Sequence, residues 1–341
     1  MKTIFMAFLA VFILWACDRE TETTPVIDNS DGTELLFSFI SSDGAFSKAF
    51  GDAVSTNAEK KINRCIFYIF KKNGDRIFRK EILSPQLDNI TATPVSIKVP
   101  GLQKDSTYKC YAVINEFFSD AEINNLNELG AVIKNNIAAH NGKWSEVKDD
   151  VLQARIFSGF SMVGNKNLIL TDLISPQTVT IPVSRITAKV DVQVTLDLIP
   201  PYNTGVWKID SVKLNKAQAT TPLLLKIPTT NVGTLTFSQA SNMLNATNFQ
   251  NRFYVFENGP MPTANWMNMD IFGTYNGALV KYNIPLNPCP TGTDCGAGRF
   301  NRNGAYLIKV FVKGPEATQL NLLVNVQDWA TICTQPYTVG Q

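Results

Sequence analysis

The sequence lacks most of the residues and motifs on which enzymes depend. Its 341 residues include a single histidine, His140. It contains no G-x-S-x-G elbow, no phosphate-binding loop, no H-E-x-x-H helix and no dinucleotide-binding glycine motif. His140 stands in a polar run with no candidate nucleophile or metal partner beside it, so we interpret it as an ordinary loop residue. We therefore expect no enzymatic activity, no catalytic residues and no cofactor.

Net charge and long apolar runs are also scarce. The chain carries 31 Lys and Arg against 29 Asp and Glu, which gives a formal net charge of +2. A nucleic-acid partner would call for a basic patch with interleaved aromatic residues, so we expect none. Beyond the N-terminus no apolar run approaches the ~20 residues of a membrane-spanning helix. This balance is typical of a protein that meets other proteins.

The cysteines do not form a metal-binding set. Cys289 and Cys295 bracket a loop rich in Pro and Gly, and we predict a disulfide between them. One histidine and no second cysteine pair at metal-ligand spacing leave a zinc site incomplete, so we expect no metal. Cys65 and Cys110 fall in strand-like runs, where they are either buried free thiols or a bridge.

The N-terminus has the pattern of a bacterial lipoprotein export signal. Lys2 precedes an apolar run that ends at Trp15, the small Ala16 follows, and Cys17 offers a thiol for lipid. We predict that residues 1–16 are a signal peptide and that acylated Cys17 tethers the chain to the outer membrane. A run of about 12 apolar residues is too short for a transmembrane anchor. An ordinary signal peptide stays open, because Trp15 is bulky for its position.

Most of the remaining chain alternates like β-strands. Leu35 to Ile40 is apolar on both faces, which predicts a strand buried on both sides. Two further runs, 65–70 and 77–83, flank Asn73-Gly74 and predict a hairpin. The further strands that we expect are 95–99, 108–114, 252–256, 270–275, 278–284, 306–313 and 320–329.

One helix and one domain boundary interrupt the strands. Ser119 and Glu122 fit a capping box, and Ile123, Leu126 and Leu129 form one apolar stripe of a short helix. A boundary near Pro182 separates two halves of similar style. A strand over 185–194 begins the second half, and 207–214 is expected to pair with it. Two β-sandwich domains in series follow from this pattern.

These landmarks together resemble the fimbrillin family, the subunits of type V pili of Bacteroidales bacteria. The matching pieces are Cys17, Ser47–Gly51, Phe160–Gly164, Val183–Val190, Phe253–Asn258, Tyr282–Leu286, Asn301–Tyr306 and Val326–Trp329. The resemblance implies a mainly β fold of two tandem transthyretin-like Greek-key β-sandwich domains with minor helices. It divides the chain into a lipidated propeptide over 17–48, an N-terminal domain over 49–182 and a C-terminal domain over 183–341.

The resemblance also implies assembly by strand exchange. A trypsin-like protease would cut between Lys48 and Ala49, so that the first strand leaves with the lipid and uncovers an apolar groove. A C-terminal strand within about 320–341 of another subunit would fill that groove by β-augmentation. We expect the following residues to form this donor strand: Leu322, Val324, Val326, Trp329 and Ile332. Burial of about six such side chains gives a gross gain on the order of 10 kcal/mol.

The partners implied are other fimbrial subunits joined head to tail, the outer membrane, the processing protease and a host or bacterial surface receptor. The expected role is adhesion and surface colonisation. Lys48 stands where family members carry arginine, so an uncleaved, lipid-bound anchor subunit is an alternative to a cleaved stalk subunit. A tip adhesin comes third. The alternative of another class is a monomeric surface lipoprotein that binds a glycan or a host protein.

Overall fold

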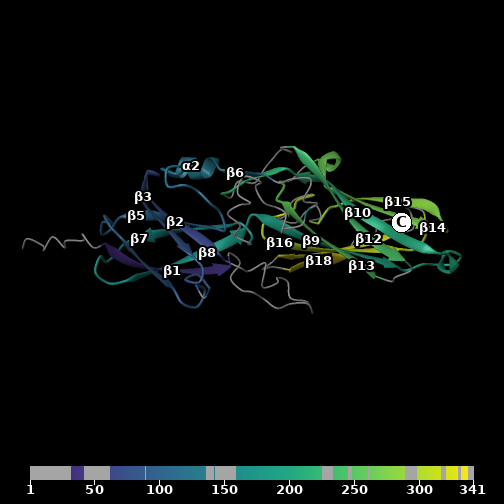
Figure 1. The fold of residues 1–341 in the computed structure, drawn as a ribbon, viewed down its shortest axis with the longest axis horizontal. Helices are drawn as coiled ribbons and strands as arrows, with labels where there is room; N and C mark the ends of the chain where they lie inside the picture. Colours follow the sequence, from purple (N-terminus) through teal and green to yellow (C-terminus); the bar gives the residue numbers. More distant parts are fainter. Residues whose placement is uncertain are drawn as a thin grey trace, which may run out of the picture.

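The protein consists of two β-rich lobes that follow each other end to end along one long axis (Figure 1). The structure is a computed structural model, and it describes residues 32–41, 62–88, 90–135, 142, 159–224, 233–244, 248–259, 262–288, 298–315, 320–328 and 332–336. The side chains of residues 41, 241–249, 320–328 and 332–336 lie outside this description.

The first lobe is one seven-stranded sheet that folds over on itself. Its strands are β1 (Thr33–Ser41), β2 (Arg64–Lys71), β3 (Arg76–Leu83), β4 (Val95–Val99), β5 (Thr107–Ile114), β7 (Met162–Ile169) and β8 (Gln177–Arg185), in the order β3-β2-β5-β7-β8-β1-β4. The fold-over lies at β7 and β8, which pair over only three positions. At Gly164 a Cβ atom would stand 2.1 Å from the Pro182 oxygen, so the close approach at this corner requires glycine.

The core of the first lobe lies between the two halves of this folded sheet. The inward side chains of β1 meet those of β2, and the rings of Phe37 and Phe39 lie 4.6 and 5.7 Å from the ring of Phe67. Inward side chains of β4, β5 and β8 complete one continuous buried cluster. Because apolar residues recur at every second position of these strands, one face of each is buried.

The second lobe is a sandwich of two separate sheets. A four-stranded sheet has the order β12-β10-β14-β15, and a five-stranded sheet the order β13-β9-β16-β17-β18. The bounds are β9 (Thr187–Leu196), β10 (Trp207–Gln218), β12 (Thr234–Leu244), β13 (Asn248–Phe256), β14 (Asn268–Tyr275), β15 (Ala278–Pro285), β16 (Gly304–Val312), β17 (Leu320–Asp328) and β18 (Ile332–Pro336). Single-turn helices η4 (Tyr202–Thr204) and η5 (Thr263–Asn265) lie in the connections, and Trp207, Tyr282 and Phe253 are buried between the sheets.

A strand pair joins the lobes, and a buried ion pair within the second lobe holds the segment that packs on the first lobe. Strand β6 (Ile133–Asn135), which follows helix α2 (Leu126–Ala131), pairs with β11 (Thr220–Pro222) of the second lobe. Arg302 donates to Glu257 through Nε at 2.8 Å and to the backbone oxygens of Pro222 and Leu223 at 2.9 and 3.0 Å. Leu223 packs in a buried cluster with side chains of β2 and β5, so this network fixes the second lobe against the first.

The mainly β, two-sandwich class predicted from the sequence is confirmed, and three local expectations are wrong. The helix begins at Leu126, six residues later than a cap at Ser119 implies, because Asn125 caps it by accepting from the N–H of Glu128. Strand β10 does not pair with β9, because the two belong to opposite sheets. The third error concerns β1 and is described below. Strand β8 runs through residues 182 and 183, and the predicted domain boundary there stays a prediction.

Candidate functional site

Strand β1 occupies an interior position in its sheet although it comes first in the described chain. It runs parallel to β8, where Leu35–Ser41 faces Gln177–Val183, and antiparallel to β4, where Thr33–Phe37 faces Val95–Val99. Neither neighbour follows β1 directly in sequence, so β1 belongs to no hairpin. Its removal would break backbone hydrogen bonds on two sides without opening a tight turn.

The two faces of β1 differ more than its sequence predicts. Leu35, Phe37 and Phe39 are fully buried, whereas Leu36 is half-buried and Ile40 is 46% exposed. The expectation of burial on both faces is therefore wrong at Leu36 and Ile40, although Ser38 between them is buried and its hydroxyl shares a hydrogen bond of 3.0 Å with that of Thr180. Burial of three large side chains contributes about 5–9 kcal/mol before ordering costs. Excision of β1 would leave an apolar groove in the space that these three side chains fill.

The C-terminal strands lie at the edge of the second lobe. β17 pairs with β16 along its whole length, from Val312 opposite Leu320 to Gly304 opposite Asp328. β18 pairs with β17 and is the last strand in the order of its sheet. Along β17, positions 320, 322, 324 and 326 are apolar and share one face, while asparagines stand at 321 and 325. This alternation has the period of the inward residues of β1.

The first strand and the last one point to opposite ends of the molecule. Thr33 of β1 faces Val99, and β1 runs from the outer end of the first lobe toward the second lobe (Figure 1). β18 runs from the level of Gln327 back to the level of Leu323, toward the outer end of the second lobe. A groove left by β1 would therefore open at one end of the molecule, and the C-terminal strand leads to the other.

Several residues predicted to act in assembly lie outside the described residues: Cys17, Lys48, Ala49, Cys289, Cys295 and Trp329. His140 also lies outside them. Leu322, Val324 and Val326 stand in β17 and Ile332 in β18, where only their strands are described. The structure thus places the donor residues in neighbouring strands, and their role stays a prediction.

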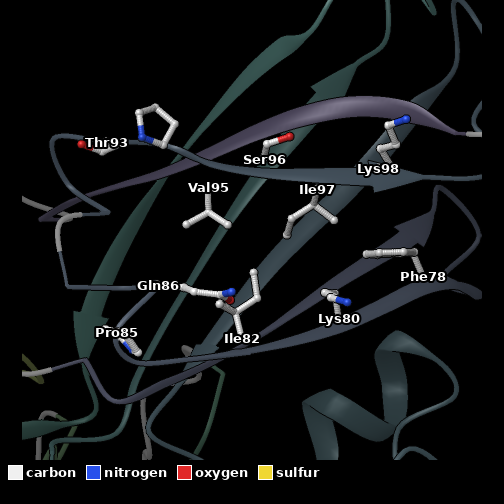
Figure 2. A pocket seen from close by; sticks show the side chains of 11 residues that line it. Phe78, Lys80, Ile82, Pro85, Gln86, Thr93, Val95, Ser96, Ile97 and Lys98 are labelled. Carbon is white, nitrogen blue, oxygen red and sulfur yellow. The ribbon is translucent and has the colours of Figure 1, made fainter.

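A groove runs along the open side of the first lobe, between its two edge strands β3 and β4. Its volume is about 750 Å³, and Ile82, Val95 and Ile97 point into it (Figure 2). Lys80 of β3 lies beside the apolar floor, whereas Lys98 leaves β4 on the side away from Val95 and Ile97 and stands opposite Glu34 of β1 (Figure 2). No carboxylate of the described residues forms an ion pair with Lys80, so the groove combines an apolar floor with one positive side chain.

Cys65 and Cys110 are free thiols inside the core that β1 closes. On the paired strands, Cys65 faces Ile114 and Cys110 faces Ile69, so the thiols are four positions apart and form no bridge. Burial raises the pKa of the Cys65 thiol well above its usual range and that of Cys110 to about 12. Both thiols are therefore protonated and unreactive while the core is closed.

Other site chemistry is absent from the part of the chain that the structure describes. No three His, Cys, Asp or Glu side chains there come close enough to hold a metal ion. No described helix combines the length and apolarity needed to span a membrane.

Sequence reasoning missed β8, the parallel neighbour of β1. The sequence analysis predicts no strand between residues 164 and 182, where Thr178 and Thr180 interrupt the apolar pattern. Val179 and Ile181 are nevertheless buried at alternate positions. That period-two pattern was the available signal.

Comparison with solved structures identifies the fold. No protein-family model matches the sequence, and no curated protein is similar enough to count as a relative. A fimbrilin (FimA) from Porphyromonas gingivalis superposes with a TM-score of 0.59 at 12% identity, covering 89% of this chain and 99% of that one. The tip fimbrial protein Mfa3 of the same species, with C-terminal truncation, gives 0.56 at 14% identity, covering 87% and 99%. A fimbrial assembly protein from Parabacteroides distasonis gives 0.54 at 13% identity, covering 89% and 98%.

The chain has a fimbrillin-type fold. The match extends over both lobes, since it covers nearly nine tenths of this chain. The resemblance proposed from the sequence motifs is thereby supported at the level of the fold.

Proposed function

We propose that the protein is a structural subunit of a surface fimbria and polymerises by protease-assisted strand exchange. It is exported as an outer-membrane lipoprotein through Cys17, and cleavage after Lys48 releases the lipid together with β1. The C-terminal strand of another subunit then fills the groove between β8 and β4. The protein is not an enzyme and serves adhesion and surface colonisation.

One observation carries the proposal. β1 is an interior strand that belongs to no hairpin and buries Leu35, Phe37 and Phe39 in the core. Another chain can replace a strand in that position: β8 stays paired with β7, and the edge strand β4, whose partner in the sheet is β1, regains a partner when the new strand enters. An empty groove of this kind exposes apolar side chains and two unpaired edges, which drives its occupation.

The ends of the molecule support a head-to-tail arrangement. The groove opens at the outer end of the first lobe and the C-terminal strand leads toward the outer end of the second (Figure 1). A contact between two different surfaces of each subunit does not close on itself, so it extends into a filament. The neighbours that are fimbrial proteins by name support the same role at the cell surface.

Mass spectrometry of the mature protein from its native host tests the cleavage. A mature N-terminus at Ala49 is the expected result. An acylated Cys17 with β1 retained would overturn cleavage and favour the lipid-bound anchor subunit instead.

Deletion of residues 330–341 tests donation. The deletion removes β18 together with Trp329's C-terminal neighbours, and we expect the processed chain to remain monomeric. Filaments that assemble as in the full-length chain would show that β18 is not the donor strand.

A second candidate is a monomeric surface protein that binds an acidic ligand, a glycan or a host protein, in the groove between β3 and β4. Lys80, which lies beside the apolar floor and forms no ion pair with a described carboxylate, favours this candidate. Binding of anionic but not neutral oligosaccharides, lost in Lys80→Ala, is its expected signature. No binding to a glycan array by the intact chain would exclude the glycan form of this candidate.

A further inference from the structure

Exposed large apolar side chains gather at the two outer ends of the molecule. Eight such side chains are exposed among the described residues. Five of the eight stand at the ends: Ile169 and Ile174 on the first lobe, and Ile199, Val206 and Leu279 on the second. Single exposed apolar residues are ordinary on a protein surface, but a cluster at each end of an elongated molecule calls for an explanation.

The first-lobe patch consists of Ile169 and Ile174, which are 63% and 72% exposed. Ile169 ends β7 at the side away from the second lobe, and Ile174 stands in the turn between β7 and β8. That turn is well formed, because the Asp172 carboxylate accepts from the N–H groups of Ile174 at 3.0 Å and of Ser175 at 3.3 Å. Ile174 is therefore presented to solvent on an ordered turn.

The second-lobe patch consists of Ile199, Val206 and Leu279, which are 42%, 54% and 89% exposed. Val206 and Asn276 exchange two hydrogen bonds, from the Val206 N–H to Asn276 Oδ1 at 2.8 Å and from the Asn276 N–H to the Val206 oxygen at 2.9 Å. These bonds tie the 199–206 connection to the hairpin that carries Leu279. The patch is thus also held on ordered backbone.

We propose that the two patches form an end-to-end contact between successive copies of this chain, with the first-lobe patch of one copy against the second-lobe patch of the next. This inference rests on the proposed head-to-tail assembly, because the β1 groove opens beside the first-lobe patch and the C-terminal strand leads toward the second-lobe patch. Strand insertion between two copies brings these ends together. Apolar residues on ordered turns can then be buried without ordering a loop.

The end contact is too small to hold two copies by itself, since stable interfaces bury about 1,200–2,000 Å². Its effect comes from linkage to the strand, which raises the effective concentration of one patch beside the other. The contact therefore acts on the rate of assembly and on the stiffness of the joint rather than on whether a filament forms. Loss of one apolar contact of about 1.4 kcal/mol corresponds to a tenfold change in rate or equilibrium constant.

The test uses the chain from residue 18, with a sequence-specific protease site inserted after Lys48 so that cleavage starts assembly at a defined time. Light scattering follows assembly of wild type, Ile174→Glu, Leu279→Glu and the pair Ile174→Lys/Leu279→Glu. We expect each Glu variant to assemble about tenfold more slowly, and the Lys/Glu pair to recover most of the rate at low salt and lose it at 1 M salt.

Ile133→Glu is the matched control, because Ile133 is 51% exposed but lies at the junction between the lobes. It should assemble at the wild-type rate, and thermal unfolding of the uncleaved chains should show that all variants fold. Wild-type rates in both Glu variants, or equal slowing in Ile133→Glu, would overturn the end contact.

The outcomes separate this inference from the proposed function. If the cleaved wild type does not assemble, strand exchange and the end contact fail together. If deletion of residues 330–341 leaves assembly intact, only donation by β18 fails, and the Glu variants still decide on the end contact. If assembly needs residues 330–341 but ignores Ile174 and Leu279, only the end contact is wrong.

Discussion

Strands β1 and β18 stand near opposite ends of the chain, and their sheets hold them in opposite ways. β1 has a partner on each side and three side chains in the core, whereas β18 lies at the edge of its sheet and pairs with β17. A strand held like β1 does not leave a folded domain spontaneously, so its removal needs a cut chain. A strand held like β18 can leave at low cost. The difference fits a pair of acceptor and donor roles.

Thiol labelling tests the contrast between β1 and β18 most directly, because Cys65 and Cys110 report on the core that β1 closes. A pKa of about 12 for Cys110 leaves a thiolate fraction at pH 8 roughly a thousandfold below that of a free cysteine. In a chain that begins at residue 18 and has Cys289, Cys295 and Cys333 replaced by Ser, we expect maleimide labelling to be slow before cleavage. It should rise at least ~100-fold after cleavage when residues 330–341 are deleted.

The full-length cleaved chain supplies the discriminating arm of that experiment. If a donor strand refills the groove, labelling returns to the slow rate of the intact chain. Fast labelling in assembled filaments would mean that the core stays open, which contradicts refilling.

Alkaline pH should act on the same thiols in a predictable direction. The native state keeps Cys110 protonated, while the unfolded thiol ionises near 9.0. The unfolded state therefore binds fewer protons between pH 9.0 and about 12, and the free energy of unfolding falls as pH rises through this window. Denaturant midpoints at pH 8 and pH 10, compared with Cys110→Ala, measure this fall, which should become smaller in the variant because only the buried Cys65 thiol still contributes to it.

Substitutions within β1 sharpen the contrast between its two faces. Phe37→Ala removes a fully buried ring that packs on Phe67, and we expect a loss of about 3–5 kcal/mol in the free energy of unfolding of the first lobe. Ile40→Ala, at an exposed position of the same strand, is the control and should cost about 0.5 kcal/mol or less. Urea unfolding measures both, and equal losses would mean that the outer face is covered after all.

The sequence predicts strands well where alternation is clean and poorly where tertiary contacts decide. The hairpins of β2 with β3 and of β14 with β15 follow from alternating apolar residues around Asn-Gly turns. β7 does not, because its polar Asn165, Lys166 and Asn167 face solvent in mid-strand. The sequence does not predict the partner of β10 either, since two strands adjacent in sequence can pair within one sheet or pack against each other across a sandwich.

The candidate site also has one part that the sequence predicts and one part that only tertiary contacts decide. Leu35 to Ile40 stands out as an apolar strand in sequence, but its insertion between β8 and β4 depends on contacts across more than fifty residues. The wrong expectation for its outer face has the same cause. The apolar content of a strand indicates that its burial is favourable, but it does not indicate which face other elements will cover.

The buried pair of Arg302 and Glu257 tests whether the lobes that hold β1 and β18 unfold together. Arg302→Met leaves Glu257 buried without its cation, and we expect a loss of about 3 kcal/mol. Arg302→Met/Glu257→Leu should recover most of it, because no lone charge remains buried. Tryptophan fluorescence and far-ultraviolet dichroism along one urea titration show whether one transition or two move. If the double variant does not recover the lost free energy of unfolding, packing shape rather than charge determines stability at this junction.

The smallest effect is expected at β18. In the uncleaved chain, deletion of residues 330–341 breaks pairing on one side of β17 and should lower the free energy of unfolding by about 1 kcal/mol, well below the loss in Phe37→Ala. Hydrogen exchange in the intact chain should rank the strands in the same order, with the amides of 332–336 exchanging much faster than those of 33–41. If β18 is protected as strongly as β1, a C-terminal strand cannot leave its own lobe on the time scale of assembly. The donor strand must then be sought elsewhere than in the last strand of the chain.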